Sequence, residues 1–149
     1  MGKNILINEK GVALIIVLLM LLILTLIGIS AISTTTFETN ISGNERVGTN
    51  AFYAADAGVQ VGLNQLPDTK LIPVTTIGTD SSYWSGSLTD KGSPKKLTNY
   101  GEYFRPYFDS AWGFNRYQVN ATGESFKAMK EVELQATWGP FNRGTGYNN

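Results

Sequence analysis

A long uninterrupted run of apolar residues dominates the first third of the chain. Residues 11–37 carry no charged side chain, and about 20 apolar residues suffice to cross the hydrocarbon core of a membrane as a helix. The run is too long for the core of a removable secretory signal, and Ala31 is a weak candidate for signal cleavage. The pattern therefore predicts a hydrophobic helix over residues 12–36, preceded by a charged leader at residues 1–11.

A second helical pattern follows, with polar residues on one side. Apolar or small residues recur at alternating steps of three and four, which is the spacing of one face of a helix. These positions are Phe52, Ala55, Val59, Gly62 and Leu66. Pro67 ends the pattern, because proline cannot continue a helix. We therefore expect an amphipathic extension over residues 37–66, and we expect Phe52, Ala55, Val59 and Leu66 to pack against a sheet.

Residues 33–49 have weak intrinsic helix propensity. Ser33 and three threonines follow one another, and Gly43 and Gly48 each cost up to about 1 kcal/mol relative to alanine. Two interpretations stay open for this segment. It is either a frayed or kinked linker, or part of a helix built to bend or to pack tightly.

The C-terminal part of the chain alternates with the period of β-strands. Tyr117, Val119 and Ala121 alternate with polar residues, and the pattern returns in residues 130–138. Residues 122–125 (Thr-Gly-Glu-Ser) are expected to form the turn between the two strands. A two-stranded ribbon cannot bury its own apolar face, so the amphipathic helix is the expected cover.

Residues 67–110 are rich in proline and glycine and are expected to be mostly loop, with one edge strand near residues 71–77 that Pro73 interrupts. Aromatic residues gather from Tyr83 onward. They are expected to form the core of a small β-rich domain at residues 67–149, with a ligand platform or a partner surface as alternatives. The predicted fold class is α+β, with one long N-terminal helix packed on a small antiparallel sheet.

Composition argues against catalysis. The chain has no cysteine and no histidine, which removes thiolate chemistry, the usual general base and the commonest metal ligand. Net charge is zero, and Lys95-Lys96 is the only short basic pair in the β-rich part, so no nucleic-acid surface is expected. We predict a protein that is not an enzyme and that needs no metal or cofactor.

The N-terminal segments resemble a known family. Gly11 to Ile15 running into Leu24 to Gly28, followed by Glu38 to Asn44 and by Ala51 to Gly58, is similar to the type IV pilins and type II secretion pseudopilins. More narrowly, the segments resemble PilX-type minor pilins over roughly residues 8–66. The fold that this resemblance implies is pilin-like, with the hydrophobic half of the helix embedded in a membrane or a filament.

The resemblance also implies processing, location and partners. A prepilin peptidase would cut after Gly11, and Val12 would become the N-methylated first residue. The helix would wait in the bacterial inner membrane with its N-terminus in the cytoplasm, and would then enter a pilus in the periplasm or at the cell surface. The implied partners are other pilins and minor pilins, the peptidase, the inner-membrane assembly platform and a tip adhesin.

Two positions depart from the usual pilin pattern. Most pilins carry glutamate at the fifth mature residue, where this chain has Ile16, and many close a C-terminal loop with a cysteine pair that is absent here. Ile16 cannot pair with a neighbour's terminal ammonium inside an apolar core. The hypothesis is a subunit that primes or caps the pilus. The alternatives are a type II secretion minor pseudopilin, a main filament subunit, and a signal-anchored envelope protein that binds a ligand or polysaccharide.

Overall fold

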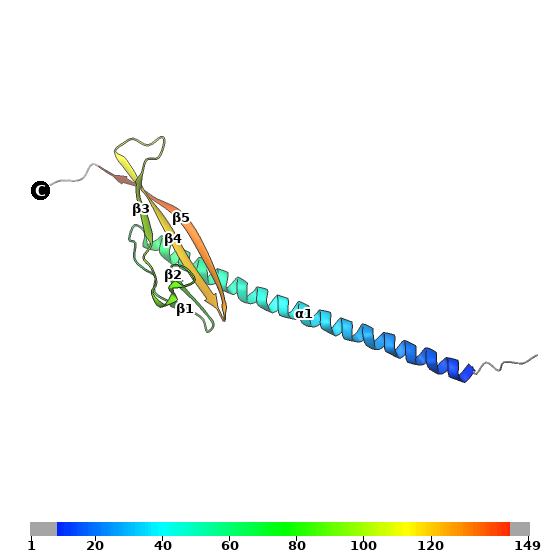
Figure 1. Cartoon of the computed structure of the whole chain (residues 1–149). Helices are drawn as coiled ribbons and strands as arrows, with labels where there is room; N and C mark the ends of the chain where they lie inside the picture. Colours follow the sequence, from blue (N-terminus) through cyan, green and yellow to red (C-terminus); the bar gives the residue numbers. More distant parts are fainter. Residues whose placement is uncertain (1–8, 144–149) are drawn as a thin grey trace, which may run out of the picture. The chain divides into compact units, whose positions relative to one another are not determined.

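The structure, a computed structural model, describes residues 9–143 and divides the chain into two units, before and after Gly43. Helix α1 (Glu9–Gln65) begins in the first unit and ends in the second (Figure 1). Its last turn is closed by Leu66 N–H donating to Leu63 O at 3.3 Å, and Pro67 follows. The predicted helix over residues 12–66 is therefore confirmed, with an end one residue earlier.

Residues 33–49 are helical throughout, so the frayed-linker interpretation is wrong. The threonine hydroxyls donate to backbone carbonyls one turn earlier: Thr34 to Ser30, Thr35 to Ala31 and Thr36 to Ile32, at 2.9–3.1 Å. A hydroxyl bonded in this way stays inside the helix and needs no water or other partner. The segment can therefore stay helical in apolar surroundings despite its weak propensity.

The second unit contains a five-stranded antiparallel sheet built around one long strand. Strand β4 (Trp112–Ser125) pairs along its length with β5 (Ala128–Asn142). Its other edge pairs with β2 (Ser81–Ser85) near one end and with β3 (Thr98–Tyr103) near the other. Strand β1 (Thr75–Ile77) extends the sheet beyond β2, and a 3-10 turn η1 (Asp90–Gly92) lies between β2 and β3.

Two expectations about the strands need correction. Residues 122–125 continue β4, and the hairpin turn lies at Phe126 and Lys127 instead. Residues 67–110 also contain three strands, whereas one edge strand was expected. That edge strand exists as β1, which starts after Pro73. The sequence concealed β2 and β3 because both are short and depend on pairing with β4.

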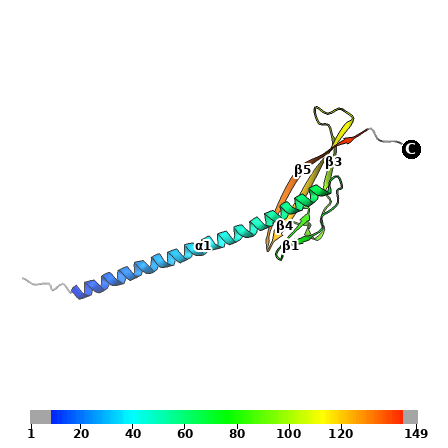
Figure 2. The ribbon, with the colours of Figure 1, turned by 180° about the vertical axis from the view of Figure 1, so that it is seen from behind.

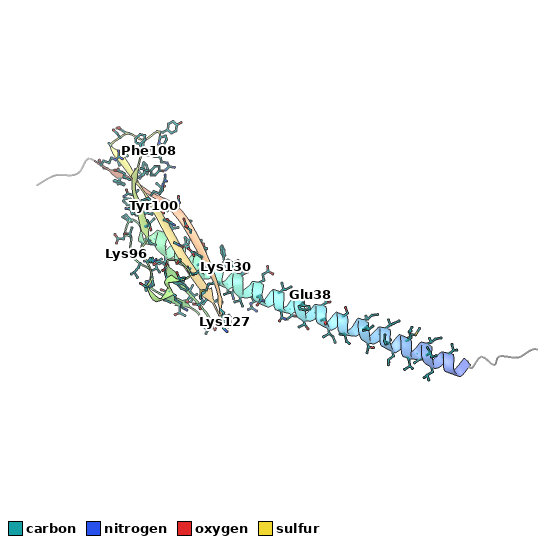
Figure 3. The ribbon with its side chains drawn as sticks, viewed as in Figure 1. Glu38, Lys96, Tyr100, Phe108, Lys127 and Lys130 are labelled. Carbon is teal, nitrogen blue, oxygen red and sulfur yellow. The ribbon has the colours of Figure 1, made fainter. Side chains whose placement is uncertain are left out.

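The aromatic residues divide between the core and the surface. Trp84, Phe114 and Tyr117 are at most 2% exposed, so the expectation of an aromatic core is confirmed for these rings. Phe108 lies edge-on against Phe114 with ring centroids 4.8 Å apart, and it is labelled in Figure 3. Tyr107 is fully exposed. The buried rings therefore stabilise the sheet, and the exposed rings are available to solvent or partners.

The C-terminal part of α1 lies along one face of the sheet, as Figures 1 and 2 show from opposite sides. The contact is made by small residues. A Cβ atom added at Gly58 would come within 3.0 Å of the Ala121 Cβ, and one added at Gly62 would come within 2.5 Å of a Val119 methyl carbon. A Cβ atom at Gly123 of β4 would collide with the helix backbone at Ala51 and Ala55. Helix and strand therefore approach each other backbone to backbone.

The segment between β2 and β3 is held by buried hydroxyls and one carboxylate. The Ser85 hydroxyl accepts from Ile72 N–H at 2.8 Å and donates to the Lys95 carbonyl. The Asp90 carboxylate accepts from both the backbone N–H and the hydroxyl of Ser87 at 2.8 Å. These Ser87 bonds, helped by the Lys95 ammonium at 3.2 Å, hold the pKa of Asp90 below its ordinary value.

Glycine substitutions test the close approach of α1 to β4. Gly123→Ala should lower the free energy of unfolding by about 3 kcal/mol, because its Cβ meets helix backbone that cannot move aside. Gly48→Ala is the matched control: its Cβ would lie 3.9 Å from the nearest atom, so it should stabilise the helix by up to about 1 kcal/mol. Urea unfolding of the full chain in detergent, followed by the fluorescence of buried Trp84, measures both. Equal effects of the two variants would refute close packing.

Acid titration tests the Asp90 turn. The pKa of Asp90 is lower in the folded chain than its ordinary value of 3.8. The Asp90 carboxylate therefore contributes fully to stability when the pH is above 3.8, and this contribution is lost as the pH falls through the folded pKa. The stability gap between the native chain and Asp90→Asn should therefore be constant from neutral pH to about 4 and shrink below it. Urea midpoints measured across this pH range give the gap. A gap that stays constant into strong acid would contradict the assignment.

Candidate functional site

The first unit exposes its apolar side chains along the whole hydrophobic run. The large side chains between Val12 and Ile32 are 45–70% exposed, and nothing else in the described part of the unit covers them. A contiguous apolar surface of this extent marks contact with a membrane or a partner. By length and composition, α1 is the one described helix that could cross a membrane. This unit therefore needs an apolar environment that the chain itself does not provide.

The predicted processing residues lie at the start of this surface. Gly11 is half-buried in the first turns of α1, and Val12 is 49% exposed beside it. Residues 1–8 of the predicted leader lie outside the described residues, while Glu9 and Lys10 already belong to α1. The boundary between charged and apolar sequence thus coincides with the predicted cleavage point.

Ile16 lies within the apolar surface and is 50% exposed. From Gly11 onward the next charged residue is Glu38, near the end of the first unit (Figure 3). The apolar surface therefore contains no side chain that could form an ion pair along this length. Contacts made by this surface must rest on shape and apolar burial alone.

The predicted packing residues on the C-terminal part of α1 divide into two groups. Ala55 and Val59 are buried, and Leu66 packs half-buried against the core cluster of Val59, Val119 and Ala121. Phe52 was expected on the same face, and this was wrong. It is 47% exposed, and its ring packs against the ring of Tyr53 with the two centroids 6.0 Å apart. The buried face runs through Ala51, and Phe52 lies about 100° further around the helix.

Sequence reasoning missed the small residues that make this face. Ala51, Ala54 and Gly58 are buried, and none of them was in the predicted packing stripe. Ala51, Ala54/Ala55, Gly58 and Gly62 recur at steps of three or four, which is the signal that could have identified a close-packed helix face. The predicted stripe already contained Ala55 and Gly62, but it left out Ala51, Ala54 and Gly58.

Two ionisable groups of the second unit have pKa values that their neighbours shift. Beside Asp90, a shifted pKa occurs at Lys70, where the hydrogen bond and charge of Asp68 raise it on an exposed surface. Within residues 9–143, no group of three or more acidic side chains is placed to hold a metal ion.

Comparison with known families identifies the N-terminal segment. The family model PilX N-terminal matches residues 10–60, a range that takes in Gly11, Val12, Ile16 and the buried helix face as far as Val59. Neither the curated proteins nor the solved structures include a match. The residues that carry the resemblance are thus the apolar surface and the first part of the packing face.

The match agrees with the physical properties of both units. The exposed apolar helix is consistent with membrane anchoring and with association in a pilus, and an α+β arrangement of one long helix and a small antiparallel sheet is pilin-like. A pilin segment is typical of a structural protein that interacts with other pilus components. The match over residues 10–60 and the long apolar helix together support the assignment of this chain to the PilX-type pilins, as a type IV pilin-related protein.

Proposed function

We propose that this chain is a minor type IV pilin that helps to prime or cap pilus assembly after cleavage between Gly11 and Val12 by a prepilin peptidase. The observation that carries the proposal is the PilX N-terminal match over residues 10–60, a range that includes Gly11-Val12 and the apolar part of α1 that the chain leaves uncovered. Residues 1–11 are the leader, 12–36 the assembly helix, 37–66 its amphipathic extension, and 67–149 the periplasmic domain.

The exposed helix surface supports a change of surroundings between membrane and filament. Burial of apolar area is worth about 25 cal/mol per Å² whether lipid or protein covers it. Because lipid tails are as apolar as leucine, transfer from the membrane into a filament core costs little hydrophobic energy, and packing between helices decides the equilibrium. The protein waits in the inner membrane with a cytoplasmic N-terminus and then enters the pilus with other pilins.

Ile16 supports a position at the end of the fibre. After cleavage it is the fifth residue, and it has no carboxylate to neutralise the terminal ammonium of a neighbouring subunit. An uncompensated ammonium is expensive in an apolar core, so a subunit next to Ile16 would be disfavoured. At the tip, or in the complex that starts assembly, one of the two neighbours is absent and this cost does not arise.

Coexpression with a matching prepilin peptidase tests the processing step. We expect mass spectrometry to find a mature chain that begins with N-methylated Val12. Gly11→Val should block cleavage, whereas Gly28→Ala, a glycine of the same helix with open space around it, should leave cleavage intact. An intact Met1 in the native chain would instead support a signal-anchored envelope protein.

The distribution of the chain in assembled pili tests the role of Ile16. Immunogold electron microscopy should place the native chain at fibre ends, and Ile16→Glu should spread it along the shaft because the new carboxylate can pair with a neighbour's ammonium. Ile15→Glu is the control, since it adds the same charge one position away. Abundant native chain along the whole shaft would sink the tip hypothesis.

A further inference from the structure

Strand β5 leaves one edge of the sheet open. It pairs with β4 on one side, and no described strand pairs with its other side. Every second residue of an antiparallel edge strand directs its backbone N–H and C=O groups away from the sheet, where a further strand can bond to them. The open stretch covers residues 128–139, since Pro140 follows and lacks the N–H donor. We call this stretch the β5 edge.

The β5 edge is less protected than the other edges of the described sheet. Edges are commonly protected by short strands, by bulges or by lysine side chains that lie across them. Strand β1 has three residues, and the register of β3 shifts between Asn99 and Glu102. Lys130 belongs to the β5 edge, but its Cε lies next to α1, 3.9 Å from the position of a Cβ added at Gly48 (Figure 3). The backbone of the β5 edge is therefore accessible to another strand.

The two faces of the β5 edge have different chemistry. Val132 and Leu134 lie on the side of α1 and pack half-buried against the core cluster. Glu131, Glu133 and Gln135 alternate with them and are exposed on the opposite face. The side chains of an added strand would lie beside the same two rows, because neighbouring strands share the faces of a sheet. A strand that fits here has apolar side chains toward α1 and polar ones away from it.

The exposed row of the β5 edge carries two carboxylates without a basic partner. Glu131 accepts from Asn120 Nδ2 at 2.7 Å, and neither Glu131 nor Glu133 forms an ion pair within residues 9–143. Glu124, which lies on the same face of β4, pairs with Lys91. Opposite charges at directly facing positions of two strands attract each other, and like charges repel. The two carboxylates therefore select an added strand that has basic side chains at two alternate positions.

This chain does not supply such a strand. Its 12 lysines and arginines never occur two positions apart in the sequence. Lys95 and Lys96 are adjacent, and Lys127 and Lys130 are three positions apart. A second copy would bring its own acidic β5 edge without the basic pair that this edge selects. The complementary strand therefore comes from a different protein.

A hollow of about 430 Å³ lies between α1 and the beginning of β5. Gly48 and Phe52 line it from the helix, and Lys130 lines it from the strand. The Phe52 side chain is 47% exposed there, although it belongs to the part of α1 that packs on the sheet. An apolar side chain that an added strand directs toward α1 would lie against this ring and remove its surface from water. The hollow thus adds an apolar contact to the main-chain bonds of the β5 edge.

We propose that the β5 edge binds an extended segment of another protein by strand addition. The segment has two basic side chains at alternate positions, opposite Glu131 and Glu133, and apolar side chains between them that point toward α1. In this binding mode the main-chain hydrogen bonds supply affinity, and the alternate side chains select the sequence. The proposal does not depend on the pilin function, because it concerns a binding activity of the second unit.

Calorimetric titration of the full chain in phosphatidylcholine nanodiscs tests the proposal, because a lipid surface without net charge does not attract a cationic peptide. The probe is the capped peptide Thr-Val-Lys-Val-Lys-Val-Thr, and empty nanodiscs give the blank. The lysine peptide should bind, whereas the same peptide with glutamate in place of both lysines should not. A third peptide keeps the lysines but carries N-methyl groups on the backbone nitrogens of its lysines and valines. It should not bind either, since these residues cannot donate main-chain hydrogen bonds.

Variants of the chain locate the binding site. Glu131→Gln and Glu133→Gln together should weaken binding of the lysine peptide about threefold or more, because two cross-strand charge pairs are lost. Asp80→Asn and Asp109→Asn together are the matched control, since they remove the same charge from exposed residues outside β5. Near-ultraviolet circular dichroism from buried Trp84 reports whether each variant is folded, and the comparison of the three peptides on the native chain needs no variant.

Phe52→Ala tests the apolar contact and should also weaken the lysine peptide, by about threefold or more. The proposal is overturned if the lysine peptide does not bind, if the glutamate or N-methylated peptide binds equally well, or if the aspartate control loses as much affinity as the glutamate variant. An unchanged affinity of Phe52→Ala would contradict the position of the segment beside α1. Dimers of the peptide-free chain that the lysine peptide disperses would overturn the proposal too, because they would assign the β5 edge to a second copy.

Discussion

The backbone-to-backbone approach of α1 and β4 is the constraint on which the second unit depends. Gly123 leaves room for the helix backbone at Ala51 and Ala55, and Gly58 and Gly62 leave room for strand side chains. Only one alignment of helix and strand places each glycine opposite a group that needs its space. Because β4 pairs with β2, β3 and β5, fixing β4 on the helix fixes the sheet as well. The chain achieves this without any disulfide.

Helix α1 belongs to both units, but its apolar side chains are exposed in the first unit and buried in the second. Before Gly43 the helix exposes large aliphatic side chains, and after it the helix buries small ones. Large side chains on an uncovered helix favour lipid or other helices, since they offer wide contact area in every direction. Small side chains allow one specific partner to come close. The first arrangement suits a subunit that changes surroundings, and the second suits a domain that must keep its shape.

Buried hydroxyls fix the conformation of the irregular part of the sheet, as glycines fix the alignment of the helix on β4. Ser85 and Thr122 satisfy backbone groups in a segment that has little regular structure. Such bonds contribute modestly on average but are costly to leave unmade, so they favour one loop conformation over its competitors. The consequence is a polar cavity with fixed walls on the face opposite α1.

Local periodicity was enough to predict α1, the alternating strands of the hairpin and the apolar surface that begins at Val12, since each depends on neighbours in the chain. Tertiary structure alone decided that Phe52 lies outside the packing face, that residues 122–125 extend β4, and that β2 and β3 exist. Glycine is the physical reason for the first two of these results, the position of the packing face and the extension of β4. Its lack of a side chain permits a turn and a close contact equally, and only the element lying opposite Gly123 or Gly58 determines which one forms.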